Sequence, residues 1–134
     1  MNKRTIFLIG PMAAIALGSA VAAGDGTKEA NTALIHAQMA AAATDLKTVH
    51  LHLRHVVNCL VGTSGKGFDA SAGDPCEGMG DGALNDSVGD KALHAKLEAV
   101  LREADLGLKD KNYVHAKKTV DNVIEHLKDA EMHK

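Results

Sequence analysis

Eight histidines occur in this 134-residue chain, and their imidazoles are the side chains best suited to do chemistry. Neutral imidazole is the commonest protein ligand for transition-metal ions, and its charge changes near neutral pH. The chain has no Trp and one Tyr, so its aromatic residues point to no particular chemistry. We therefore expect metal binding first, with solvated histidines that share no role as the alternative. The eight are His36, His50, His52, His55, His94, His115, His126 and His133.

The spacing of several histidines places them on common helix faces. A helix turns about 100° per residue, so residues three, four, seven or eleven apart share a face. His52 and His55 are three apart, and His126 lies eleven after His115 and seven before His133. The His-Glu-x-x-His pattern of zinc proteases does not occur. The spacing thus gives pairs of candidate ligands. Which histidines lie close together in space depends on how the helices that carry them pack.

Apolar periodicity predicts the helices that would position these histidines. Apolar residues recur at spacings of four and three from Ile35 to Leu60, which is typical of a helix packed in a bundle. The same pattern appears twice more towards the C-terminus, on either side of a short polar connection. The predicted helices cover about residues 31–60, 90–108 and 112–132.

A glycine-rich segment, residues 61–89, separates the first two predicted helices. A loop of this length is uncommon in a compact domain unless it is functional or tied down. Cys59 and Cys76 are the only cysteines, and in an exported chain such a pair predicts a disulfide. Thiolate binding of a soft metal is the alternative. We predict one all-α domain, residues 24–134: an antiparallel three-helix bundle, like a four-helix bundle, with a long glycine-rich loop tied by the disulfide.

The N-terminus has the three-part layout of a secretory signal. Lys3 and Arg4 precede an apolar stretch that ends in small residues at Ala23. We predict that residues 1–23 are cleaved off and that the mature protein is periplasmic or secreted, with an uncleaved anchor as the alternative. Removal of the leader changes the formal net charge from −2 to −4. No basic patch suited to nucleic acid or an anionic membrane is expected in the mature chain.

The predicted helix heights indicate which histidines meet. If the last two helices are joined near residue 109, and residues 60 and 90 lie at one end of the bundle, three helices bring histidines to one layer. Such a site needs neutral imidazoles, so binding should weaken as the pH falls through about 6.5. The predicted layer contains His52, His94 and His126 with His55 in support, and a second layer contains His50 and His115.

The C-terminal stretch YVHAKKTVDNVIEHLKDAEMHK, together with the leader and the Ala-rich amphipathic helices, resembles the periplasmic small metal-binding protein family of His-rich helical bundles. The resemblance covers about the last fifth of the mature chain, including His115, His126 and His133. It implies a soluble periplasmic bundle that binds copper and other divalent ions. The chain differs from that family in its two cysteines, its fewer histidines and its glycine-rich insert.

These observations favour a protein that buffers or delivers divalent transition-metal ions, with copper first and nickel or zinc next. Imidazole suits all three, and Cu(II) has the highest intrinsic affinity. A b-type haem bundle is the second hypothesis, since His or Met side chains can ligate haem between helices. A non-catalytic accessory subunit that docks through the glycine-rich loop is the third. We expect no enzyme, because no nucleophile, base and orienting group is recognisable.

Overall fold

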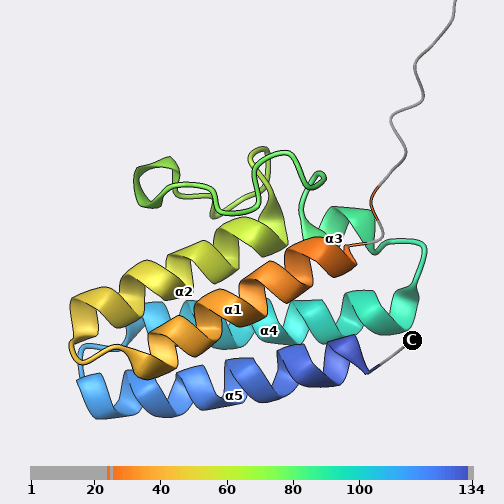
Figure 1. The fold of residues 1–134 in the computed structure, drawn as a ribbon. Helices are drawn as coiled ribbons and strands as arrows, with labels where there is room; N and C mark the ends of the chain where they lie inside the picture. The colour runs from red at the N-terminus through yellow and green to blue at the C-terminus, as the bar shows by residue number, and fades with distance from the viewer. Residues whose placement is uncertain (1–23, 25, 133–134) are drawn as a thin grey trace, which may run out of the picture.

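The computed structural model describes Gly24 and residues 26–132 (Figure 1). The predicted signal peptide, residues 1–23, and His133 lie outside the described residues. Within them the chain is helical and has no strand, as predicted, and no helix is long and apolar enough to cross a membrane. The elements are α1 (Thr27–Ala42), α2 (Leu46–Val61), a 3-10 turn (Ala70–Ala72), α3 (Ala83–Asp86), α4 (Lys91–Lys109) and α5 (Tyr113–Glu131).

Two helical hairpins pack against each other to form a four-helix arrangement (Figure 1). The first hairpin is α1 and α2, and the second is α4 and α5; α1 also packs on α5, and α2 on α4. At one end the hydroxyl of Tyr113 donates to the Ala43 carbonyl over 2.9 Å, and Lys117 Nζ donates to the same carbonyl over 3.1 Å. These bonds satisfy a carbonyl that the end of α1 leaves without a helical partner.

The single helix predicted from about residue 31 to 60 is wrong, because the chain turns between Ala42 and Leu46. Ala43 and Asp45 both adopt extended backbone angles. The Asp45 carboxylate accepts from the Thr48 backbone N–H over 2.9 Å and from the Thr48 hydroxyl over 2.7 Å. A capped N-terminus of this kind starts a new helix, and the bundle therefore has four long helices in place of the predicted three.

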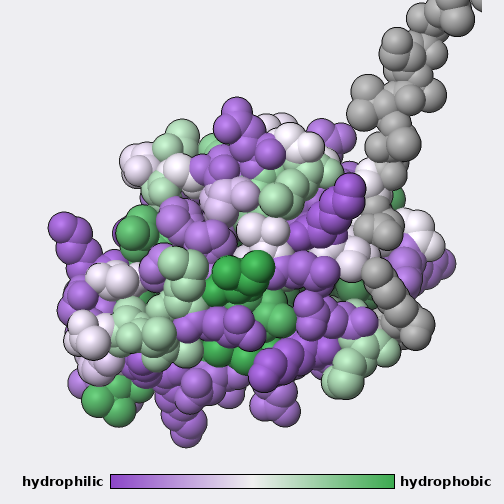
Figure 2. All heavy atoms as spheres, viewed as in Figure 1, coloured by the Kyte–Doolittle hydropathy of each residue, from purple (hydrophilic) through white to green (hydrophobic). Residues whose placement is uncertain are grey.

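The apolar seam that suggested one helix belongs to α2 alone. Val49, Leu53, Val56 and Leu60 are fully buried, as expected. Ile35 and Met39, on the α1 half of the predicted seam, are 56% and 45% exposed. Figure 2, drawn from the same side as Figure 1, shows apolar surface in the middle of this face, surrounded by hydrophilic side chains.

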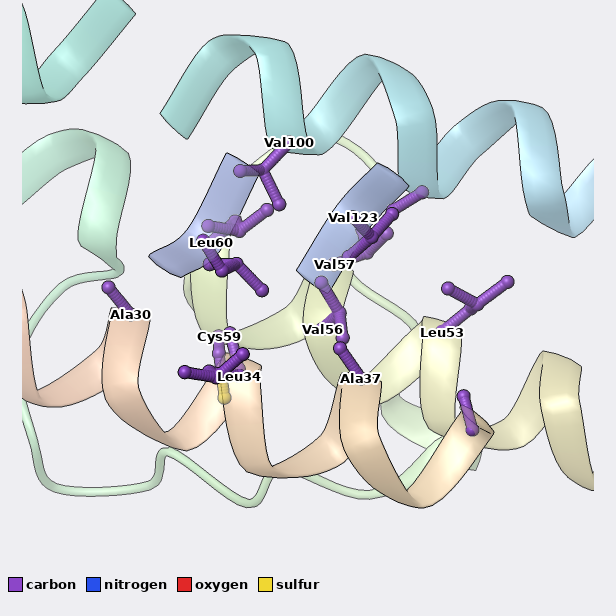
Figure 3. Close-up of a cluster of buried hydrophobic side chains, with 14 of the residues drawn as sticks. Ala30, Leu34, Ala37, Leu53, Val56, Val57, Cys59, Leu60, Val100 and Val123 are labelled. Atoms are coloured by element: carbon purple, nitrogen blue, oxygen red, sulfur yellow. The ribbon is translucent and has the colours of Figure 1, made fainter. Parts of the chain in front are cut away.

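The buried face of α1 consists mainly of alanine. Ala33, Ala37 and Ala40 are fully buried, and Leu34 is nearly so. Figure 3 shows Ala37 and Leu34 directed towards Val56 and Cys59 of α2. Because methyl groups occupy little space, the α1 backbone can lie close to α2, and side chains at the edges of the two helices come within reach of each other.

Residues 62–90 connect the two hairpins and contain the 3-10 turn and α3. The predicted disulfide between Cys59 and Cys76 is present and ties this segment to α2. Asn58, which is fully buried, adds three hydrogen bonds: its Nδ2 donates to the carbonyls of Asp69 and Gly73, and its Oδ1 accepts from the Asp69 N–H. The residue before α3 also returns to the end of α2, since a Cβ on Gly82 would lie 2.5 Å from the Gly62 nitrogen. The segment is therefore held against α2 at several points.

Candidate metal centre

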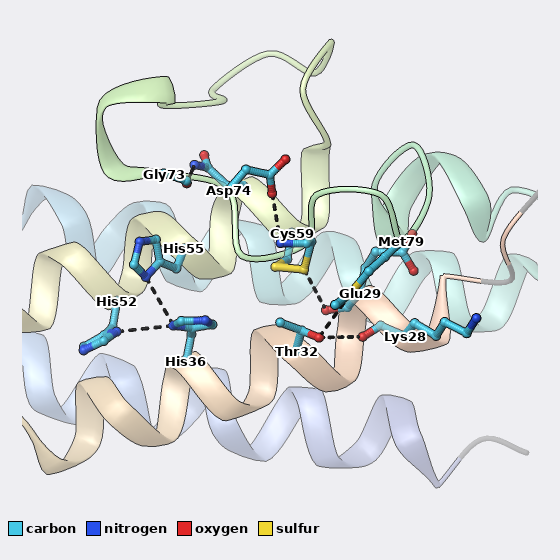
Figure 4. The surroundings of a disulfide bond; sticks show 12 residues. Lys28, Glu29, Thr32, His36, His52, His55, Cys59, Gly73, Asp74 and Met79 are labelled. Carbon is cyan, nitrogen blue, oxygen red and sulfur yellow. Dashed lines mark hydrogen bonds between the residues drawn. A yellow bond between two sulfur atoms is a disulfide. The ribbon is translucent and has the colours of Figure 1, made fainter.

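Three imidazoles converge on one point between the two helices of the first hairpin (Figure 4). His36 comes from α1, and His52 and His55 come from α2. Nδ1 of His36 lies 3.3 Å from Nδ1 of His52 and 3.2 Å from Nδ1 of His55. Among Gly24 and residues 26–132, this is the only group of three or more His, Cys, Asp or Glu residues that offers ligand atoms within 4.8 Å of one another.

The turn between α1 and α2 explains why these histidines meet. In an antiparallel hairpin, residues at equal distances from the turn lie at the same height. Thr44 lies midway between His36 and His52 in the sequence, so their side chains are level. His55 is three residues further along α2 and therefore stands one turn away on the same face. The capped turn at Asp45 thus sets the register of the cluster.

A backbone carbonyl determines the tautomer of His55. Its Nε2 lies 2.7 Å from the Ala72 carbonyl oxygen, which can only accept. Nε2 must then carry the proton, and the neutral ring presents the Nδ1 lone pair to His36. A metal-ligating histidine usually has its second nitrogen bound in this way to a carbonyl or carboxylate. The observed contact therefore prepares His55 as an Nδ1 ligand.

Hydrogen bonding alone does not satisfy the three Nδ1 atoms well. Because His55 Nδ1 can only accept, a proton on His36 Nδ1 would have to serve both His55 and His52. If His52 donates instead, His36 and His55 place two lone pairs against each other. A cation at the centre would accept all three lone pairs, so the arrangement favours a bound metal ion.

The surroundings favour the neutral form of His36 and His52. Burial lowers the pKa of His36 from 6.5 to about 4, with smaller contributions from the neighbouring His55 and His52. Burial, followed by His55, also holds the pKa of His52 below its usual range. Because only neutral imidazole ligates a metal, both effects keep lone pairs available in mildly acidic solution.

Two of the three nitrogen separations, those that involve His36, fit tetrahedral coordination. Two nitrogens bound at 2.0–2.1 Å to a tetrahedral metal ion lie about 3.3 Å apart. The contacts of His36 with His52 and His55 already have this length. All three rings are partly exposed. A metal ion held here would have three protein ligands, as in zinc sites that keep a position for water, and not the four protein ligands of structural zinc sites.

The structure brings together two of the six predicted metal ligands, His52 and His55, and joins them to His36. It does not bring His94 to this cluster. The Nδ1 of His94 lies 3.0 Å from the Leu84 carbonyl and 3.2 Å from the Ser87 hydroxyl, so this ring links α4 to α3. His94 thus faces α3 and Ser87, and the predicted heights did not take the helix face into account.

The other three predicted ligands are also apart from the cluster. His126 lines a cavity of about 260 Å³ between α4 and α5, together with Lys96 and Asp129. His50 is on α2 with a buried Nε2. His115 is in the first turn of α5 with its Nδ1 3.9 Å from an Asp110 carboxylate oxygen. The predicted four-histidine layer is therefore not formed.

Sequence reasoning left His36 out of the predicted ligand set. The signal that identifies it is the pair Thr44-Asp45, followed by Thr48, which is typical of a helix N-terminus. Once a turn is placed there, His36 and His52 become level. An unbroken apolar pattern concealed the turn, because α1 ends and α2 begins without a change in periodicity.

The cluster does not suit haem. The ring centroids of His36, His52 and His55 lie 4.6–5.6 Å apart. Axial haem ligands approach the iron from opposite faces of a porphyrin, and no porphyrin fits between rings this close. A single small ion could be held by the three rings at this spacing.

Comparison of the chain with protein-family models, with curated proteins and with solved structures found no match. The functional argument therefore depends on the geometry of the histidine cluster, and the resemblance to the periplasmic small metal-binding proteins stays a prediction.

Proposed function

We propose that this protein binds one divalent transition-metal ion through Nδ1 of His36, His52 and His55, and that it buffers or delivers the ion outside the cytoplasm. The convergence of the three Nδ1 atoms, with His55 oriented by the Ala72 carbonyl, carries the proposal. The proposed role is metal binding without catalysis.

The ligand set favours copper, then nickel or zinc. An all-imidazole site suits these three ions, whereas Mg²⁺ and Ca²⁺ prefer oxygen ligands. Cu(II) is the strongest binder in the usual affinity order, although the two nitrogen separations that involve His36 also fit zinc. We therefore expect affinity to decrease from Cu(II) to Ni(II) and Zn(II).

The site is built for exchange more than for holding the fold together. Its histidines are only partly buried, and the hairpin that carries them is already joined to the connecting segment by a disulfide. A three-ligand site with an open position lets a donor or acceptor ligand enter before the ion leaves. The disulfide is consistent with an oxidising compartment, which supports the export that the leader predicts.

Calorimetric titration of Cu(II), Ni(II) and Zn(II) tests the proposal. The wild-type protein should bind one equivalent of each ion, and H36A/H52A/H55A should bind none at that affinity. The matched control is H94A/H115A/H126A, which removes the same number of imidazoles from α4 and α5 and should bind as the wild type does. Equal binding by both triple variants, or wild-type binding weaker than about 1 mM, would contradict the proposal.

A further inference from the structure

One stretch of the connection between the hairpins, residues 69–76, is attached along the face of α2 that carries His55. We call it the anchored segment. Arg54 Nε lies 3.2 Å from an Asp69 carboxylate oxygen, and Asn58 binds the backbone of Asp69 and Gly73. The attachment points on α2 are Arg54, His55, Asn58 and Cys59.

The anchored segment supplies the contact that orients a proposed metal ligand. Ala72 lies between the two residues that Asn58 holds, and its carbonyl accepts from His55 Nε2. The disulfide holds the end of the same segment, four residues after Ala72. Figure 4 shows the disulfide and the histidine cluster side by side over α1 and α2. Displacement of this segment would therefore free the His55 ring to change its orientation and tautomer.

We propose that the Cys59–Cys76 disulfide and the histidine cluster are linked through the Ala72 carbonyl, so that opening the disulfide weakens metal binding. The inference rests on the proposed metal site and adds a regulation to it. Coupling between two sites is reciprocal, so a bound metal ion must also protect the disulfide from opening. Loss of a partner that orients a ligand typically weakens metal binding by about 10–100-fold. Since Asn58 and Arg54 still hold the segment, we expect the low end of that range.

The redox step is an ordinary disulfide reduction. Two electrons and two protons break the S–S bond and leave two thiols. A water-soluble phosphine supplies the electrons in the test below, and it becomes the phosphine oxide by taking its oxygen from water. A thiol reductant would itself bind the metal, so a phosphine is the better probe.

The first experiment removes the disulfide without creating thiols. Zinc is titrated calorimetrically into the wild type and into C59A/C76A, and the variant should bind about tenfold more weakly. Val120→Ala is the control, because it truncates a fully buried side chain of α5 away from the anchored segment and should leave zinc affinity unchanged. Equal affinity in the wild type and C59A/C76A overturns the linkage and leaves the metal site standing. Absence of zinc binding in the wild type instead overturns the proposed function.

The second experiment uses the wild-type disulfide and covers the case in which C59A/C76A does not fold. The rate of phosphine reduction is measured with and without zinc, and H36A serves as the control. Both sulfurs are buried, so the phosphine must reach them when the anchored segment opens. A bound zinc ion that disfavours this opening should slow the reduction about tenfold in the wild type and have no effect in H36A. Equal rates with and without zinc in the wild type overturn the linkage.

A spectroscopic measurement separates this linkage from a general loss of stability. The Nε2–H of His55 is bonded to a carbonyl and should give an observable proton signal in nitrogen-resolved NMR spectra of the oxidised protein. The signal should weaken on reduction, because the Ala72 carbonyl is held less firmly, while the amide signals of α4 and α5 stay in place. An unchanged His55 signal after reduction overturns the proposal.

Discussion

The two hairpins of this protein carry histidines at similar helical spacings, yet only the first brings them together. In the first, His36 and His52 are level across the turn at Thr44, and their Nδ1 atoms are 3.3 Å apart. In the second, His94 and His126 are also at nearly matching positions about the connection between α4 and α5. His94 binds the Leu84 carbonyl, however, and His126 lines a cavity with Lys96 and Asp129. Equal height is thus not sufficient for a ligand cluster, and the helix face decides whether the cluster forms.

The largest expected effect is that of H36A in the first hairpin, compared with H126A in the second. H36A takes away the nitrogen that lies closest to both others, and zinc affinity should fall at least about 100-fold. H126A removes an imidazole from α5 and should change zinc affinity by less than about twofold, because His126 lies outside the cluster. Calorimetric titration of the two variants side by side measures both effects. A larger loss in H126A than in H36A would reverse the comparison between the hairpins.

The pH dependence of binding distinguishes buried ligands from ordinary ones. Three imidazoles with pKa values near 6.5 would lose about 1000-fold in affinity between pH 7.5 and 5.5, since each must release a proton to bind. Because burial lowers the pKa of His36 to about 4, this residue is already neutral throughout that range. The lowered pKa of His52 acts in the same direction. The loss should therefore be at most about 100-fold, as measured by zinc titration at the two pH values.

A 1000-fold loss would show that His36 titrates like a solvated histidine. The buried cluster would then not describe the protein in solution.

The anchored segment predicts a difference in stability between two asparagines. Asn58 is fully buried and makes three hydrogen bonds to backbone groups, whereas Asn122 on α5 is exposed and makes one long contact with Glu103. N58L should lower the free energy of unfolding by about 2–3 kcal/mol, because it leaves buried backbone groups without partners. N122L should change it by less than about 0.5 kcal/mol. Urea unfolding of the two variants measures the difference, and similar values would mean that residues 69–73 are not held as described.

The smallest expected effect concerns the turn that sets the register. D45A removes the cap of α2 and should lower the thermal midpoint by a few degrees, with a small loss of zinc affinity because His36 and His52 are no longer held level. Asn112 caps α5 in the second hairpin, so N112A should lower the midpoint similarly and leave zinc affinity unchanged. Thermal unfolding and zinc titration of both variants test this. A loss of affinity in N112A as large as in D45A would show that general destabilisation is responsible.

Much of the fold is accessible from the sequence because its signals are local. The apolar spacing of α4 and α5 places both helices within one or two residues, and two cysteines around a glycine-rich stretch predict the disulfide that the structure contains. The turn at Asp45 was missed because the apolar pattern of α2 continues by chance into α1, where Ile35 and Met39 are exposed. A buried face made of alanine gives only a weak hydrophobic signal.

The site is less accessible, because it depends on contacts between distant segments. His52 and His55 can be identified as neighbours from their spacing, but His36 requires knowledge of the turn. The contact between His55 and the Ala72 carbonyl depends on how residues 69–73 fold over α2, and no spacing rule predicts this. The tautomer, and thus the nitrogen that is free to bind, follows only from that contact.

A crystal structure of the zinc-loaded protein, with anomalous differences measured at the zinc absorption edge, tests the central claim most directly. We predict one strong peak within about 2.0–2.1 Å of Nδ1 of His36, His52 and His55, with the Ala72 carbonyl still bonded to Nε2 of His55. A principal peak at His94, His115 or His126, or coordination through Nε2 of His55, would contradict the account.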